Sequence, residues 1–296
     1  MTATTTERPA PARTPRAGSE SKMYWGRVRT VARTDLRQLL GARDFWAPMA
    51  GLGALFFVVV PTILLLLITQ ISDVRVVEQL STTLEALPQQ ARDNLQGDTP
   101  EAQAAYALAV FLFAPVAIVV PLTISTAVGA ATIVGERERG TGEFLAHSPA
   151  AVKEIYLGKL IASLIPGLLT VMVGFGLYSL LVNLIVGPEV GGWFFPTGPW
   201  WVLMLWVLPP FLGLTLSLVL RLSAKVKSTA AAQQASGLVS LPVIMIAYTQ
   251  SSGALYTGVG VSWAIGLLAW VAAVIALRRG MRAITRARLL GVADEM

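Results

Sequence analysis

The 296-residue chain is 54% hydrophobic and only 14% charged, and its mean hydropathy is +0.64. A globular domain carries about 25% charged residues, whereas here charges are missing from whole blocks of roughly 18 or more residues, the length that crosses a bilayer. The composition therefore excludes an ordinary water-soluble domain and indicates an integral membrane protein. The chain has no cysteine, which excludes disulfide and thiol chemistry.

The segment before the first apolar block divides in two. Residues 1–22 are rich in Thr, Pro, Ala and Arg, and we expect them to be disordered in the cytoplasm. Residues 23–45 are amphipathic and predict an interfacial helix on the membrane surface, although a merely basic juxtamembrane segment is the alternative. The apolar arc of this helix consists of Trp25, Val28, Ala32, Leu36, Leu39 and Leu40, and Arg27, Arg33 and Arg37 project elsewhere.

Six apolar blocks between residues 46 and 277 have the length and composition of transmembrane helices. They are Trp46–Ile71, Tyr106–Val134, Leu160–Val186, Trp200–Leu220, Ala230–Thr249 and Val259–Leu277. All but two of the 23 lysines and arginines lie on one side of these blocks, which the positive-inside rule assigns to the cytoplasm. We therefore predict an all-α integral membrane protein with six transmembrane helices, both termini inside and a basic cytoplasmic tail at 278–296. Because this topology explains the net charge of +6, no nucleic-acid partner is expected.

The outer regions give weaker signals. In the first outer loop, 72–105, we expect a short helix that restarts at Pro88 and ends at Gly97. The second outer loop is rich in Trp and Phe between Trp193 and Trp201, which is typical of anchors at the headgroup level. Pro242 interrupts the fifth block, so residues 241–260 could instead form a re-entrant pair of short helices.

None of the six blocks contains Asp, Glu, Lys, Arg or His. Ionisable groups inside the membrane mark proton relays, so their absence argues against a proton-driven transporter and against most intramembrane enzymes. We expect no catalytic, cofactor-binding or metal site. The remaining polar side chains favour helix packing, with a substrate path as the alternative. The candidates for that path are Thr123, Ser125, Thr126, Asn183, Gln233 and Gln234.

The connection between the second and third blocks, 135–159, is the most charged interior stretch. Gly135 and Gly140 have the spacing of the glycines in a phosphate-binding loop, but Thr141 and Gly142 follow where that loop needs Lys and Ser or Thr. Its glutamates would also repel phosphate. The connection is therefore not a nucleotide site, and a solvated charge run is the simplest interpretation of its composition.

The order of its residues is more specific. The sequence Glu-Arg-Glu-Arg-Gly-Thr-x-Glu-x-Leu (136–145), then Ser148-Pro149, Glu154-Ile155 and Leu157-Gly158-Lys159, resembles the permease subunit of ABC-2-type ABC transporters. The interfacial helix, the six-block layout and the segment 225–234 agree with that resemblance, which covers most of residues 23–279.

The resemblance implies that this connection forms a cytoplasmic coupling helix that docks on a separate ABC ATPase subunit, where ATP and Mg²⁺ would bind. The coupling residues would be Glu136, Arg137, Glu138, Gly140, Thr141, Glu143, Phe144 and Leu145. Gly142 departs from the family, which usually has Leu there. The resemblance also implies export by a dimer with a second permease copy or a paralogue, in a bacterial inner membrane. The alternative is a stand-alone ion-coupled or passive transporter.

Overall fold

The computed structural model describes residues 23–71, 89–138, 140, 147–226, 228–251 and 259–283, and every regular element in these ranges is a helix. The elements are α1 (Trp25–Gly41), α2 (Arg43–Ala54), the π-helical η1 (Leu55–Val59), α3 (Val60–Leu66), η2 (Leu67–Ile71), α5 (Gln89–Arg92), α6 (Pro100–Ala107), η3 (Leu108–Leu112), α7 (Ala114–Glu138), α9 (Val152–Ile185), α10 (Gly187–Val190), α11 (Gly198–Val202), η4 (Leu203–Val207), α12 (Leu208–Ser223), α13 (Thr229–Ser251) and α14 (Val259–Ala283).

Five continuous helical stretches are long and apolar enough to cross a membrane. They are Trp46–Gln70, Pro100–Glu136, Val152–Ile185, Gly198–Ser223 and Gly260–Arg282. Each coincides with a predicted block, and three begin or end several residues beyond it, because the helices continue into the charged flanks. The remaining predicted block, Ala230–Thr249, lies within α13, which runs through Pro242 to Ser251 as one helix. Residues 252–258, in the second half of the possible re-entrant segment, lie outside the described residues.

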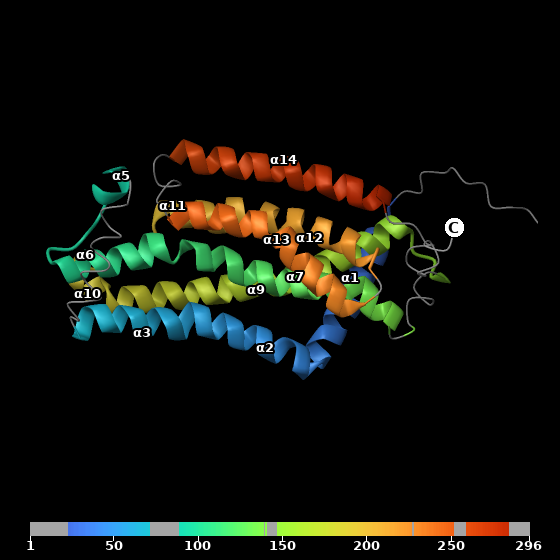
Figure 1. Cartoon of the computed structure of the whole chain (residues 1–296), viewed down its shortest axis with the longest axis horizontal. Helices are drawn as coiled ribbons and strands as arrows, with labels where there is room; N and C mark the ends of the chain where they lie inside the picture. The colour runs from blue at the N-terminus through green and yellow to red at the C-terminus, as the bar shows by residue number, and fades with distance from the viewer. Residues whose placement is uncertain are drawn as a thin grey trace, which may run out of the picture.

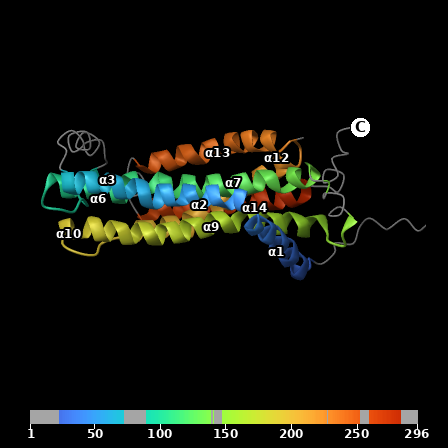
Figure 2. The ribbon, with the colours of Figure 1, turned by 90° about the horizontal axis from the view of Figure 1, so that it is seen from below.

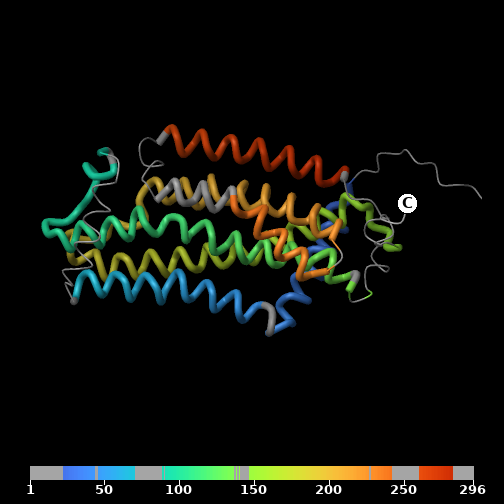
Figure 3. The backbone as a smooth tube through the Cα atoms, in the orientation of Figure 1, coloured from blue at the N-terminus to red at the C-terminus, as the bar shows by residue number. Residues whose placement is uncertain are grey.

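The long helices lie side by side in an elongated bundle (Figure 1). The helix from Pro100 to Glu136 is its centre, since 67% of its apolar window is buried, against 28% for both the first and the last stretch. The tube in Figure 3 shows α14 along one edge and the α2–α3 stretch along the opposite edge. We call the end of the bundle that carries α1 the α1 end, and the end that carries α10 the α10 end; α1 crosses the bundle at an angle there (Figure 2).

Small residues allow α7 to approach its neighbours closely. A Cβ on Gly167 of α9 would lie 2.0 Å from Ser125 Oγ, and one on Gly129 would lie 2.8 Å from a methyl group of Leu216 on α12. On α13, Ala232, Ser236 and Ser240 are buried at intervals of four residues, and Ala232 packs with Ala130 and Val134 of α7. This pattern of small side chains is typical of close helix crossings in membranes, and the run Ser125–Thr132 of α7 consists almost entirely of small residues.

The aromatic residues of the second outer loop have two different roles, and the prediction that they all anchor at the headgroup level is wrong for two of them. Trp193 and Trp201 are exposed, as anchors would be, but Phe195 and Trp200 are fully buried. The indole of Trp200 donates to the Val110 carbonyl at 2.9 Å, and the Tyr178 hydroxyl donates to the Ala109 carbonyl at 2.7 Å. Both acceptors belong to the π-helical turn η3, whose wider hydrogen-bond ring leaves backbone carbonyls available to side chains.

Candidate functional site

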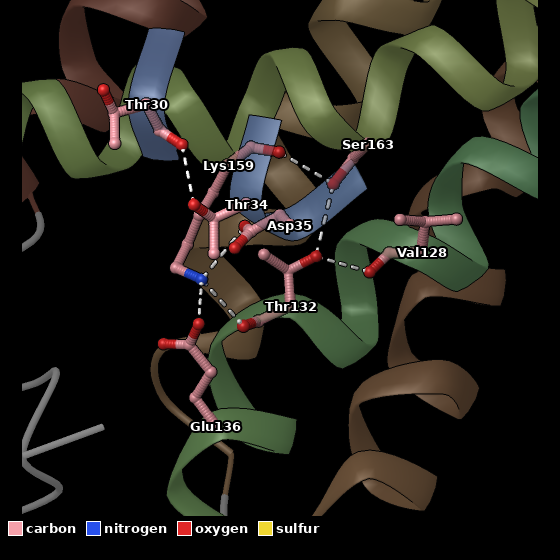
Figure 4. A network of polar contacts seen from close by, with 8 residues as sticks. All are labelled: Thr30, Thr34, Asp35, Val128, Thr132, Glu136, Lys159 and Ser163. Carbon is pink, nitrogen blue, oxygen red and sulfur yellow. Dashed lines mark hydrogen bonds and ion pairs between the residues drawn. The ribbon is translucent and has the colours of Figure 1, made fainter. Parts of the chain in front are cut away.

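Lys159 is buried at the α1 end, where three helices meet (Figure 4). Its Nζ lies 2.7 Å from Glu136 Oε1 of α7, 3.3 Å from Asp35 Oδ2 of α1 and 3.2 Å from the Thr132 carbonyl. An ammonium group has three N–H donors, so these contacts satisfy all of them. The side chain of Lys159 is 1% exposed, against 14% for Glu136 and 16% for Asp35. We call these three residues the Lys159 cluster.

The residue before this lysine allows α1 to reach it. A Cβ on Gly158 would lie 2.7 Å from Val31 Cβ and 3.0 Å from the Val28 carbonyl of α1, which is closer than a side chain tolerates. The backbone of α1 therefore lies directly against α9 at Gly158, and Asp35, on the same face of α1 as the buried Val28 and Ala32, meets Lys159. The pair Gly158-Lys159 thus combines a close approach with an ion pair.

Hydroxyl groups extend the contact between α7 and α9 by one helical turn. Ser163 Oγ donates to the Lys159 carbonyl at 2.9 Å and lies 3.3 Å from Thr132 Oγ1, which in turn lies 2.6 Å from the Val128 carbonyl (Figure 4). These bonds fix the rotamers beside the ion pair and leave a cavity of about 160 Å³ between α1, α7 and α9.

Glu154, in the first turn of α9, holds the start of α1. Its Oε1 accepts the Tyr24 N–H at 2.8 Å, and its Oε2 accepts the Ala151 N–H at 2.9 Å. Arg27 of α1 lies 3.6 Å from the same carboxylate. A glutamate that bonds back to the N-cap backbone is the usual way to satisfy unpaired N–H groups at a helix start, and here one carboxylate does so for α9 and also binds the residue before α1.

Glu138, the last residue of α7, holds the start of α13 in the same way. Its carboxylate accepts the Thr229 N–H at 2.8 Å and also the Thr229 hydroxyl. Ser228 adds an ordinary N-cap, since its Oγ accepts the Ala231 N–H at 3.2 Å. Ser223, at the end of α12, donates to the Ala130 carbonyl at 2.7 Å. The ends of α1, α9, α12 and α13 are therefore all bonded, directly or through one neighbour, to α7.

The predicted coupling residues fall into two groups. Glu136 and Glu138 bind the chain's own helices, Arg137 lies in the last turn of α7, and Gly140 is exposed with a φ of +70°. Thr141, Glu143, Phe144 and Leu145 lie outside the described residues. The prediction that the connection docks on another subunit is therefore untested, but the two glutamates contribute to the base of the connection.

The predicted path residues do not form one lining. Thr123 is exposed on α7, Ser125 and Thr126 are buried against neighbouring helices, and Gln233 and Gln234 are exposed on α13. Asn183 lies at the α10 end, where its Oδ1 accepts the Phe194 and Phe195 N–H groups at 2.9 and 3.0 Å. This asparagine fixes the turn before the cis Phe195–Pro196 bond. Thr123 instead borders an apolar groove of about 460 Å³ between the first membrane helix and α7, which Phe56 and Val119 also line.

Sequence reasoning missed the roles of Asp35, Glu154, Lys159 and Thr229. A signal for the ion pair was present, because Asp35 is the one acidic residue of the sequence between residues 23 and 43 and it falls beside the apolar arc. Lys159 directly precedes a predicted membrane block, where an unpaired ammonium would be costly. Among the described residues, no three His, Asp or Glu side chains are grouped closely enough to hold a metal ion.

The geometry defines a helical multi-pass membrane protein whose charged contacts gather at one end, around the connection between its second and third membrane helices. No curated protein matches the chain. The sequence profile described as "ABC-2 family transporter protein" matches residues 29–262, and the chain belongs to this family of ABC transporter membrane components.

Proposed function

We propose that the chain is the permease subunit of an ATP-driven exporter in a bacterial inner membrane and that it forms its translocation path as a dimer with a second permease copy or a paralogue. The observation that carries this proposal is the Lys159 cluster, which joins α1, α7 and α9. It lies at the base of the 139–151 connection, the residues between the end of α7 and the start of α9. A connection whose two ends are held in this way can transmit force to the membrane helices, whereas a solvated charge run with free ends could not.

In this proposal ATP and Mg²⁺ bind to a separate ATPase subunit, and this chain performs no catalysis. The connection supplies the docking element, with Phe144 and Leu145 as apolar anchors and Glu143 as a directional charge, because buried apolar anchors surrounded by polar contacts dominate such interfaces. Glu136 and Glu138 act at its base rather than at the interface, since their carboxylates bind Lys159 and Thr229.

The proposal includes α13 as the sixth membrane helix, with both termini in the cytoplasm. The 23 residues of α13 give a length of about 35 Å at 1.5 Å per residue, which is enough to cross a hydrocarbon core of about 30 Å. The α1 end is then cytoplasmic, which agrees with the lysines and arginines of α1, α9 and α14. The apolar groove that ends at Thr123 favours a hydrophobic or amphipathic substrate.

Co-purification with a candidate ATPase subunit in detergent tests the proposal. We expect the wild type to bind the subunit and to change its ATPase rate, and we expect Glu143→Lys and the double change Phe144→Ser and Leu145→Ser to lose both effects. Glu189→Lys, an exposed glutamate on α10 at the far end of the bundle, is the matched control and should bind as the wild type does.

If no ATPase subunit binds the wild type, or if the variants in the connection bind and respond as it does, the permease assignment is contradicted. A stand-alone ion-coupled or passive transporter would then become the better explanation.

A further inference from the structure

The contact between Glu138 and Thr229 joins the last residue of one helix to the first residue of another. The carboxylate accepts both the backbone N–H and the hydroxyl of Thr229. It lies at the start of α13, where the unpaired N–H groups and the helix dipole attract an anion. Hydrogen bonds to an ionised acceptor are stronger than neutral ones, so this contact is a firm attachment although Glu138 is exposed.

The other contacts of the first turns of α13 with α7 are of a different kind. Ala232 packs with Ala130 and Val134 of α7 and with Val219 of α12, and all four are small or β-branched apolar side chains. These contacts pack α13 closely against α7. The carboxylate of Glu138 adds a directional, charged contact at the first residue of α13.

The two glutamates at the end of α7 hold different partners. Glu136 pairs with Lys159, which is buried and also bound to Asp35, so the ends of α1, α7 and α9 are joined by a cluster that is costly to break. Glu138, two residues later, reaches α13 from an exposed position. Glu138 adjoins the 139–151 connection directly at its α7 end, so a displacement of the connection acts on this carboxylate.

We propose that Glu138 is a positioning residue that carries a displacement of the connection to α13, the helix whose exposed face bears Gln233 and Gln234. The proposal rests on the proposed function, in which the connection moves with an ATPase subunit. It adds that α1, α7 and α9 move as one unit and that the carboxylate of Glu138, beside the apolar packing of α13 on α7, makes the start of α13 follow.

The absence of cysteine allows a test that needs no knowledge of the substrate. Spin labels are placed at Leu238→Cys on α13 and Leu268→Cys on α14, since both side chains are 69% exposed. The distance between the labels is measured by pulsed electron paramagnetic resonance in the complex with the co-purified ATPase subunit, without nucleotide and with ATP and Mg²⁺. We expect the distance to change in the wild type and this change to be smaller in Glu138→Ala.

Two variants separate transmission from folding. Glu138→Gln keeps an acceptor for the Thr229 N–H and should retain the change in distance. Glu189→Ala is the control for loss of an exposed carboxylate.

The outcomes distinguish the two proposals. If Glu138→Ala binds the ATPase subunit and α13 still moves as in the wild type, or if Glu138→Gln loses the change as Glu138→Ala does, the role of Glu138 is overturned and the proposed function is unaffected. If Glu138→Ala no longer binds the subunit, Glu138 is a docking residue and the positioning role is wrong. If the wild type binds no subunit, the proposed function itself fails.

Discussion

At the scale of single residues, the fold depends on a buried lysine. Lys159 pairs with two carboxylates and is 1% exposed, so removing its charge leaves Asp35 and Glu136 close together without a counter-ion. Breaking a buried ion pair by removing one partner typically costs about 3–5 kcal/mol. The stabilising role of the cluster is therefore larger than that of the exposed charges around it.

We expect Lys159→Met to lower the free energy of unfolding by about 3 kcal/mol or more, because methionine keeps the length of the side chain but not its charge. Thermal unfolding of the purified protein in detergent measures this. Lys153→Met, an exposed lysine in the first turn of the same helix, should change the melting temperature little. Equal melting temperatures for the two variants would show that the Lys159 cluster does not stabilise the fold.

The close approach of α1 to α9 at Gly158 leads to a second prediction at this scale. In Gly158→Ala the new methyl group would meet Val31 Cβ at 2.7 Å, so α1 must move away from α9 at a cost of about 1–3 kcal/mol. The side chain of Ala32 in α1 is 5% exposed. A cysteine at this position (Ala32→Cys) therefore reports the movement by the rate at which it reacts with a maleimide. The reaction should be faster in the Gly158→Ala background.

Gly176→Ala is the matched control for Gly158, because it lies on the same helix with open space around it. It should leave the reaction rate of the cysteine unchanged and stabilise α9 by about 0.5–1 kcal/mol. If both alanines have the same effect on the cysteine, α1 is not held by the close approach at Gly158.

At the scale of elements, most helices could be predicted from the sequence, but the contacts that hold one helix or turn to another could not. The blocks without charges gave the membrane helices, because a span of hydrocarbon requires a minimum apolar length. The burial of Trp200 could not be predicted, since its indole bonds to a carbonyl group of the π-helical turn η3 in a different helix. The same holds for Glu138 and Glu154, whose partners are distant in sequence.

The turn between α10 and α11 is held by such a contact, with Asn183 of α9, and this contact leads to a prediction. Asn183→Ala removes the acceptor for two backbone N–H groups and the donor to the Phe195 carbonyl, and each unsatisfied buried group costs about 1–3 kcal/mol. We expect a lower melting temperature and a change in tryptophan fluorescence, because Trp200 stacks on Phe175 and packs edge-on against Phe195.

Asn183→Asp tests the donor half of this interaction. The aspartate keeps an acceptor for the Phe194 and Phe195 N–H groups but places a carboxylate oxygen where the amide group donates to the Ser179 and Phe195 carbonyls. Its melting temperature should therefore also fall below that of the wild type, because a buried carboxylate oxygen that faces carbonyl groups is costly. An alanine variant as stable as the wild type would contradict the role of Asn183 in fixing the turn.

At the scale of the whole molecule, the charged contacts described above lie at one end of the bundle. The Lys159 cluster and the Glu154 and Glu138 contacts lie at the α1 end. The buried aromatic cluster of Tyr178, Phe195 and Trp200 belongs to the second half of α9 and to the turn and helix that follow α10. Figure 1 shows α1 and α10 at opposite ends of the bundle. A bundle with this asymmetry has one orientation in a membrane whose cytoplasmic side attracts lysine and arginine. Whether α13 crosses the membrane decides whether the chain has six spans or five.

Single cysteines in the cysteine-free chain locate the two ends of α13. Lys225→Cys stands before α13 and Gly260→Cys after it, and both positions are exposed. If α13 crosses the membrane, a membrane-impermeant maleimide added to intact cells should label Gly260→Cys and leave Lys225→Cys unlabelled until the cells are opened. Lys153→Cys and Glu189→Cys are the internal controls, since α9 between them is long and apolar enough to span the bilayer. Labelling of positions 225 and 260 from the same side would make α13 a re-entrant or interfacial helix and would leave five spans, which would place the two chain termini on opposite sides of the membrane.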